Sequence, residues 1–250
     1  MSSSSTSRDP LAGHLNHLTS SQEQAFTSLK ALLKSRDLYT DEPTPSHDDS
    51  TILRFLRARR FDIQGAYKQF SEAEQWRKNT EVEKLYEGYD ITEYDEARKV
   101  FPMWTGRQDR TGHPFYVFRV KDLDKKVGST HVLTSPADPR HHFRKLRWSQ
   151  AMDRYNHSSP TAKNSTTDTK RPPPVVALYE HLTRLVAPLV SKRRNRPNPE
   201  TPIVSSANIV DVTGVSLMQF LSLRSHLGES SGLATARYPE TLNSIYVRRR

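Results

Sequence analysis

Two consecutive amphipathic helices are predicted over residues 48–76, and this stretch restricts the fold more than any other segment. Asp48 and Asp49 are suitable N-terminal caps, and the apolar residues after them fall at helical spacing: Ile52, Leu53, Phe55 and Leu56. Asp62 offers a second cap, followed at three- and four-residue steps by Ile63, Ala66, Tyr67, Phe70, Ala73 and Trp76. The pattern therefore predicts a helix pair with a short break at Phe61-Asp62.

Four arginines crowd the end of the first predicted helix: Arg54, Arg57, Arg59 and Arg60. Cations are favourable at this position because the C-terminal end of a helix dipole is negative. From the residue pattern alone, two interpretations stay open. The arginines form either a solvated charged face or a binding site for an anion.

The run DDSTILRFLRARRFDIQGAYKQFSEAEQWRKN resembles the N-terminal helical subdomain of the CRAL-TRIO lipid-binding family, in its fungal phosphatidylinositol/phosphatidylcholine transfer branch. The resemblance implies that the two basic residues before Phe61, which are Arg59 and Arg60, bind the inositol phosphate. Lys is usual at the second position. A guanidinium presents a planar fork instead of a compact point charge, which changes the geometry of phosphate recognition.

The start of the chain is predicted to be a tail followed by one more helix. Residues 1–18 are Ser-rich at their beginning and are expected to be disordered. Ser20 to Glu23 has the spacing of a capping box, and a helical apolar pattern follows: Ala25, Phe26, Leu29, Leu32 and Leu33. Residues 19–100 are therefore assigned to the N-terminal helical subdomain.

Residues 101–250 are assigned to the lipid-binding domain that the resemblance implies. A turn at Asp109 to Gly112 and a strand at Phe115 to Val120 are predicted, and the family has such a turn and first strand here. The match implies that Tyr116 lines the lipid pocket, and a plain core position for this aromatic residue is equally open. A helix pattern carrying Phe143, Leu146, Met152 and Tyr155 spans residues 141–155, and another spans 175–190 until Pro188 interrupts its end.

A second strand is predicted from Ile203 to Val212 and resembles the central strand of the family. The match implies that Ser206 and Asn208 face a phosphatidylcholine headgroup, with Asn208 standing where Thr is usual. An apolar helix pattern follows at Val215 to Leu227. The segment ARYPETLNSI then resembles the family's Y-P-E turn, which implies that Glu240 helps to position the inositol-phosphate site.

The positive charge is concentrated in the second half of the chain. Residues 140–250 hold 18 Lys and Arg against 7 Asp and Glu, whereas residues 1–139 hold 20 against 21. Much of the excess lies in two polar, Pro-containing segments, near 156–174 and 191–202, which are expected to be flexible insertions. Such charge fits an anionic membrane surface, basic loops or nucleic acid. Because the aromatic residues that stack on bases are not interleaved with it, no nucleic-acid partner is expected.

Several function classes are not expected from the sequence. There is no cysteine, so disulfides and thiolate metal sites are excluded, and the adjacent pair His141-His142 lacks carboxylates at helical spacing. No apolar run reaches the roughly 20 residues that span a bilayer. Residues 228–232 fit G-x-S-x-G, but an apolar helix pattern precedes them and no His follows His226, so Ser230 is not expected to be a nucleophile.

The expected fold is therefore α/β, with a helical subdomain followed by a mixed sheet and flanking helices. The final segment IYVRRR ends a predicted strand with three arginines where the family's lipid domain continues, so the domain is expected to be truncated. The expected function is non-catalytic transfer of phosphatidylinositol, with phosphatidylcholine as a second ligand, by a cytoplasmic monomer without metal or cofactor. It would bind anionic intracellular membranes peripherally, at the Golgi or endosomes by resemblance. The alternative is a docking module that binds membrane or protein without transferring lipid.

Overall fold

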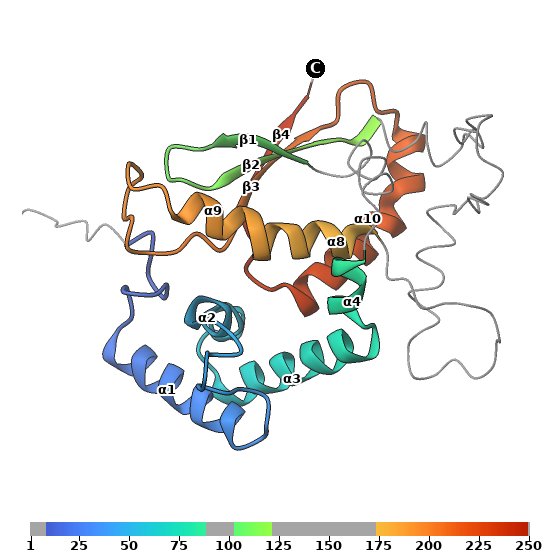
Figure 1. Cartoon of the computed structure of the whole chain (residues 1–250). Helices are drawn as coiled ribbons and strands as arrows, with labels where there is room; N and C mark the ends of the chain where they lie inside the picture. Colours follow the sequence, from blue (N-terminus) through green and yellow to red (C-terminus); the bar gives the residue numbers. More distant parts are fainter. Residues whose placement is uncertain (1–8, 89–102, 122–173, 250) are drawn as a thin grey trace, which may run out of the picture.

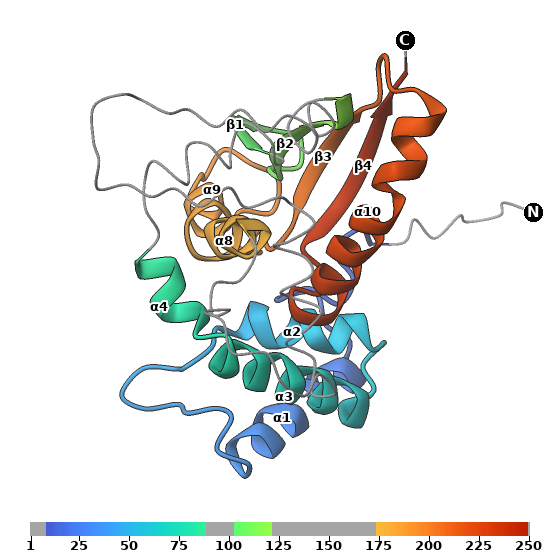
Figure 2. The same ribbon diagram turned by 90° about the vertical axis from the view of Figure 1, so that its right-hand side faces the viewer.

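The computed structural model describes residues 9–88, 103–121 and 174–249, and these form three layers. In Figure 1 the sheet is uppermost, helices α8 and α9 lie beneath it, α10 descends along its right-hand side, and helices α1 to α3 lie at the bottom. Figure 2 shows the same layers from the side, with α10 alongside the outer strand β4. The arrangement confirms the predicted α/β class, with a helical group joined to a mixed sheet and its flanking helices.

The helical group consists of α1 (Ser20–Lys34), α2 (Asp49–Ala58) and α3 (Ile63–Asn79), followed by the short α4 (Val82–Glu87). The predicted caps of the second and third helices are confirmed, because Asp48 accepts a hydrogen bond from the backbone N–H of Thr51 and Asp62 from that of Gln64. The predicted capping box of α1 is one residue off. Thr19, not Ser20, has the extended backbone that a cap needs, and Gln22 completes the box.

The core of the helical group is apolar and largely sealed from solvent. Its members come from all three helices and the connection between α1 and α2: Ala25, Leu29, Leu33, Tyr39, Ile52, Leu53, Phe55, Leu56, Ala66, Phe70 and Ala73. Phe55 and Phe70 meet edge to face with ring centroids 5.0 Å apart, a favoured aromatic geometry. Each fully buried leucine or phenylalanine stabilises the fold by roughly 1.5–3 kcal/mol, so this group has a core of its own.

The sheet has the order β1-β2-β3-β4, formed by β1 (Met103–Gln108), β2 (Pro114–Arg119), β3 (Ser206–Asp211) and β4 (Leu242–Arg248). β1 and β2 pair antiparallel, and the other two pairs are parallel. The strands predicted around 115–120, 203–212 and 245–247 are confirmed with shifted ends, whereas β1 was not predicted. Its sequence MWTGRQ lacks the β-branched alternation of a strand, and it is placed by its pairing with β2.

The turn between β1 and β2 forms as predicted. The Asp109 side chain accepts hydrogen bonds from the backbone N–H groups of Thr111 and His113, at 2.9 and 2.8 Å. Gly112 has a φ of +97° and lies against Arg196, so a Cβ there would come within 3.0 Å of the arginine side chain. This position therefore requires glycine for both backbone conformation and space.

Helix α8 (Pro174–His181) continues through the π-helical segment η1 (Leu182–Val186) into α9 (Ala187–Ser191). The prediction that Pro188 interrupts the helix end is wrong. Proline removes one backbone donor and crowds the preceding turn, and the wider π turn in front of it lets the chain continue as a helix. The predicted helix at 141–155 and nearly all of the insertion at 156–174 lie outside the described residues.

The loop after α9 is closed around one arginine, although the sequence predicted a flexible insertion at 191–202. Arg196 is only 8% exposed. Its guanidinium donates to five backbone carbonyls at the end of α9 and in the loop, which belong to Ser191, Pro197, Asn198, Pro199 and Thr201. Because one buried guanidinium binds so many carbonyls of the loop, Arg196 is a structural residue of the loop.

Helix α10 (Leu217–Arg237) connects β3 to β4 and runs ten residues further than the predicted helix pattern. Its buried Leu233 packs with Val176 of α8 and Val82 of α4, so the helices of the middle layer meet the helical group here. β4 is the outer strand of the described sheet, and its side chains at Leu242, Ile245, Tyr246 and Val247 are about half exposed or more.

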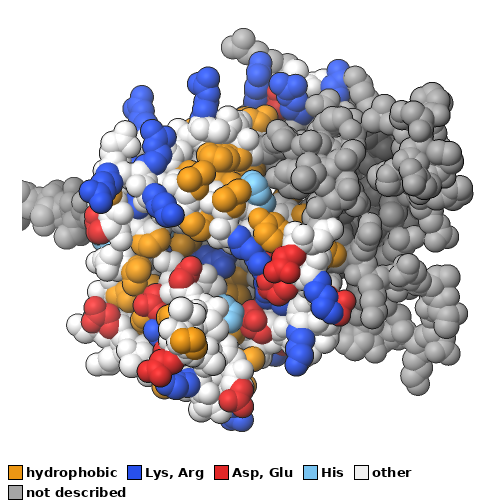
Figure 3. Space-filling model, viewed as in Figure 1, with side chains coloured by type: hydrophobic (Ala, Val, Ile, Leu, Met, Phe, Trp, Pro, Cys, Tyr) orange, Lys and Arg blue, Asp and Glu red, His pale blue; other side chains and the backbone are white. Residues whose placement is uncertain are grey.

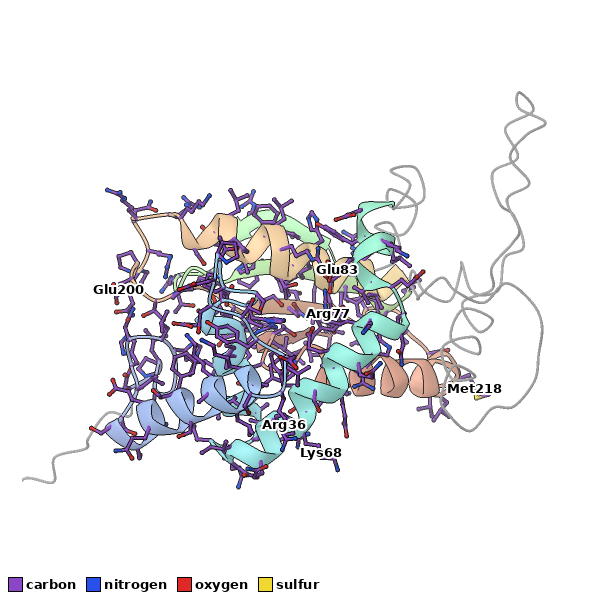
Figure 4. All side chains as sticks on the ribbon, turned by 60° about the horizontal axis from the view of Figure 1, so that its bottom comes forward. Arg36, Lys68, Arg77, Glu83, Glu200 and Met218 are labelled. Carbon is purple, nitrogen blue, oxygen red and sulfur yellow. The ribbon has the colours of Figure 1, made fainter. Side chains whose placement is uncertain are left out.

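A buried carboxylate joins the layers. Glu180 on α8 has 1% of its side chain exposed and accepts hydrogen bonds from Arg77 of α3 at 2.7 Å, from Arg184 at 2.6 Å and from the Tyr238 hydroxyl at 2.6 Å. Glu83 of α4 pairs with both arginines, and Figure 4 shows Arg77 and Glu83 pointing toward each other. These five residues are named the Glu180 cluster. Burial opposes ionisation of Glu180, but Arg77, Tyr238 and Arg184 outweigh it and keep its pKa below the ordinary value.

We expect Glu180→Gln to lower the free energy of unfolding by about 3 kcal/mol, because it removes the buried anion from Arg77 and Arg184 and leaves only the more exposed Glu83 to pair with them. Urea unfolding at neutral pH measures this. Glu87→Gln, which changes an exposed carboxylate on α4, is the control and should stay within about 0.5 kcal/mol. Since the pKa of Glu180 is lower in the folded chain, its stabilisation is complete above the ordinary value of 4.5 and declines in acid. A wild-type-like Glu180→Gln protein would contradict the structural role.

Candidate functional site

The basic end of α2 lies against the turn that leads into β4. Here the basic end of α2 means Arg57, Arg59 and Arg60. Arg57 donates a hydrogen bond from Nη2 to Oε2 of Glu240 at 2.7 Å, and the two side chains are 18% and 35% exposed. The pair joins residues 183 positions apart in the chain. Glu240 itself has a φ of +59°, so the backbone is held in a left-handed turn where its carboxylate meets α2.

The Y-P-E turn is bonded to α8 at one end and to the helical group at the other. Tyr238 donates to Glu180 within the Glu180 cluster, and Glu240 pairs with Arg57. Between them, the Thr241 hydroxyl donates to the Tyr238 carbonyl at 2.8 Å and closes the turn. Just before the turn, the Gln69 amide donates to the carbonyls of Thr235 and Ala236 at the end of α10. The position of Glu240 is therefore fixed by contacts from α2, α3 and α8.

Arg59 and Arg60 are both exposed and lie one turn beyond Arg57. Arg59 is the C-cap of α2, and Arg60 and Phe61 have φ angles of +52° and +64°. Neither arginine forms an ion pair with another described residue. Glu240 thus lies at the predicted basic segment, but it forms its ion pair with Arg57 and not with Arg59 or Arg60. Sequence reasoning assigned no role to Arg57, because nothing in the run of arginines distinguishes it from its neighbours.

Residues 9–18, which the sequence predicts to be part of a tail, form hydrogen-bonded turns that cover this end of α2. Gly13 has a φ of +81°, and a Cβ there would lie 3.2 Å from the Phe61 ring. The His14 Nδ1 lies 3.4 Å from Nη1 of Arg57. The Asn16 amide donates to the Glu200 carbonyl at 3.1 Å, which ties the segment to the Arg196 loop. The segment therefore connects the basic end of α2 with that loop.

The histidines near Arg57 are held in the neutral form. Burial, and then the charge of Arg57, lower the pKa of His14 from 6.5 to about 4. Burial is also the main cause that lowers the pKa of His113, where the nearby charges of Arg196 and Arg57 act in the same direction and Asp109 opposes them. Protonation of either ring would add a cation beside Arg57.

The predicted pocket residues of the sheet have partners inside the protein. Tyr116 on β2 is 6% exposed and packs with residues of η1 and α9. Its register partner on β3 is Asn208, so the two side chains lie on one face of the sheet. Ser206 is 4% exposed, and its hydroxyl donates to Asn208 at 3.1 Å or to the Thr241 carbonyl at 3.3 Å. The three residues are thus brought together, next to the Y-P-E turn.

Three further features bear on metal binding, membrane spanning and nucleophilic catalysis. Within the described part of the chain, no group of three or more His, Cys, Asp or Glu is placed to hold a metal ion. None of the helices that the structure describes is both long and apolar enough to cross a bilayer. Residues 228–232 lie inside α10, so the G-x-S-x-G motif does not follow a strand as a nucleophile elbow must. The predicted pair His141-His142 lies outside the described residues.

The fold is that of a helical subdomain packed against a mixed sheet. Charged residues of both parts pair where the two parts meet. Residues 25–72 match the N-terminal domain of the CRAL/TRIO family, which confirms the resemblance of that segment. The chain is 26% identical over 237 residues to the SEC14 cytosolic factor of Eremothecium gossypii and 27% identical over 235 residues to that of Schizosaccharomyces pombe. It is 28% identical over 228 residues to the phosphatidylinositol/phosphatidylcholine transfer protein SFH9 of Arabidopsis thaliana.

These matches cover nearly the whole chain but only part of each relative. They span 95%, 94% and 90% of this chain, against 63%, 67% and 32% of the three proteins in the same order. The chain is thus similar to Sec14-type proteins over most of its length, and the match to the CRAL/TRIO N-terminal domain covers residues 25–72. The site residues are predictions that these likenesses leave untested.

We expect a double-mutant cycle on Arg57→Ala and Glu240→Ala to give a coupling free energy of about 1 kcal/mol, because the pair is charge-assisted but partly exposed. Urea unfolding of the four proteins measures it. Arg59→Ala is the control, and its exposed side chain should change stability by no more than about 0.5 kcal/mol. Additive effects of the two substitutions would show that Arg57 does not hold Glu240.

We expect the free energy of unfolding to decline as pH falls from about 6.5 to about 4, because His14 takes up its proton more readily in the unfolded chain. His14→Gln removes this group and should flatten the decline. Urea unfolding across this pH range checks the prediction. Identical pH profiles for the two proteins would show that His14 does not contribute.

Proposed function

We propose that this chain is the phospholipid-binding part of a transfer protein and that it performs no covalent chemistry. The ligand is phosphatidylinositol, with phosphatidylcholine as a second candidate. The single observation that carries the proposal is the Arg57–Glu240 pair, which sets the Y-P-E turn beside the basic end of α2. The names of the relatives support lipid binding in general, since SFH9 is described as a transfer protein for both lipids.

The division of charge at this end of α2 supports an anionic ligand. Glu240 neutralises Arg57, whereas Arg59 and Arg60 carry charge that no described acidic residue pairs with. A phosphate monoester or diester bound there would accept charge-assisted hydrogen bonds from two planar guanidinium groups. In this scheme Glu240 is a positioning residue, which orients Arg57 and the turn instead of touching the phosphate. Tyr116, Ser206 and Asn208 would line the part of the ligand site on the sheet.

We expect Arg59→Ala with Arg60→Ala to lower the transfer of phosphatidylinositol between vesicles by at least about tenfold, because it removes two charge-assisted contacts. Transfer of phosphatidylcholine should change much less. Labelled lipids in donor vesicles measure both rates. Arg36→Ala with Lys68→Ala is the matched control, since these exposed cations lie on the helical group away from the sheet (Figure 4).

Equal losses for the two lipids would overturn the headgroup assignment. A wild-type chain that binds acidic vesicles but transfers neither lipid would favour the alternative function, which is a docking module without transfer. The same vesicle preparations serve both measurements. The two proposals are therefore decided by one set of experiments.

A further inference from the structure

The continuous helix from α8 to α9 is apolar on two sides. Its inner side contributes Leu182, Val186, Ala187 and Val190 to a buried cluster with the sheet. On another side, Leu185 and Leu189 are each 48% exposed, and Pro188 between them is exposed as well. A helix that is apolar on more than one side is usually buried all round, so the open side needs an explanation.

The exposed residues follow a helical spacing that places them in one stripe. Leu185, Pro188, Leu189 and Lys192 stand at positions i, i+3, i+4 and i+7. Single exposed leucines are common and carry little meaning by themselves. This stripe differs because it leads directly into a group of cations.

The cations gather from two elements at the end of α9. Lys192, Arg193 and Arg194 are all exposed, and Arg193 donates to Gln108 of β1 at 2.5 Å. That contact brings the β1–β2 turn region, with its exposed Arg107 and Arg110, to the same end of the helix. Figure 3 shows hydrophobic side chains gathered on this side of the molecule and Lys and Arg side chains along the upper and left margin.

The acidic residues nearby do not cancel this charge. Asp109 has only 14% of its side chain exposed and is used by the β1–β2 turn. Glu200 is exposed and lies 4.0 Å from His17 of the N-terminal segment. The stripe and the cations together are named the docking face, defined by Leu185, Pro188, Leu189, Lys192, Arg193 and Arg194.

We infer that the docking face binds the surface of an anionic bilayer, with Leu185 and Leu189 entering the boundary between headgroups and acyl chains. Lys192 and Arg194 would then lie at the level of the lipid phosphates, with their stems along the apolar layer. A protein partner fits less well, because a stable protein interface buries roughly 800 Å² on each side around an aromatic-rich centre. Two leucines and a proline do not supply such a centre. The inference rests on the proposed function, since lipid exchange requires contact with a membrane.

An environment-sensitive fluorophore at residue 189 tests insertion directly. The chain has no cysteine, so Leu189→Cys gives one labelling position, and Lys68→Cys on α3 gives a matched exposed control. We expect the label at 189 to shift to the blue with vesicles of phosphatidylcholine and phosphatidylserine, but not with phosphatidylcholine alone. The label at 68 should not respond. Binding of the protein without a response at 189 would overturn the inference.

Variants test the two parts of the docking face separately. Lys192→Ala with Arg194→Ala should weaken co-sedimentation with the acidic vesicles by about 25-fold, since each cation near an anionic surface contributes roughly a fivefold gain. Leu185→Gln with Leu189→Gln should also weaken co-sedimentation with the acidic vesicles, and the size of this loss should not depend on the salt concentration. Leu217→Gln with Leu221→Gln, at exposed positions of α10, is the apolar control. An equal loss from the α10 pair, or wild-type binding by both test variants, would overturn the inference.

The experiments distinguish failure of the docking-face inference from failure of the lipid-transfer proposal. A blue shift at 189 without transfer of any lipid would support the docking face and contradict transfer. Wild-type binding to acidic vesicles by both test variants, together with full lipid transfer, would contradict the docking face and leave transfer in place. Far-UV circular dichroism of every variant confirms that it is folded before it is scored.

Discussion

The placement of the helical group against the sheet depends on one buried carboxylate, that of Glu180. A charge with so little solvent contact is costly unless donors surround it, and here the donors come from three separate segments. Arg77 belongs to α3, Arg184 to the same helix as Glu180, and Tyr238 to the turn after α10. A shift of α3 or of the turn after α10 would remove a donor from this buried carboxylate. The Glu180 cluster therefore orients the layers more strictly than apolar packing could, because apolar contacts are not directional.

The candidate site depends on this arrangement. The Glu180 cluster holds the Y-P-E turn at Tyr238. The turn is thereby placed so that Glu240 reaches Arg57. The basic end of α2 is thereby divided into one arginine that is paired and two that are exposed. A phosphate ligand would meet Arg59 and Arg60 on a rigid support formed by α2 and the turn. This rigidity lowers the entropic cost of ordering long side chains around a ligand.

The helix from α8 to α9 serves three purposes along its length. Its first turns carry Glu180, its middle packs on Tyr116 through Leu182 and Val186, and its outer side presents Leu185 and Leu189. The π turn before Pro188 keeps the helix continuous, so the same rigid element joins the buried carboxylate, the sheet and the docking face.

The sequence by itself determined the helix pair of residues 48–76, its caps, the strands β2, β3 and β4, and the resemblance to CRAL-TRIO proteins. Those features depend on residues that are close together in the sequence, namely on side-chain periodicity and on capping residues a few positions apart. The tertiary structure alone decided β1, the pairing of Glu240 with Arg57 and the role of Glu180. Glu240 lies 183 positions from Arg57, and Glu180 lies 103 positions from Arg77 and 58 from Tyr238 along the chain. A run of arginines shows that charge is present, but only the folded chain shows which arginine an acidic residue reaches.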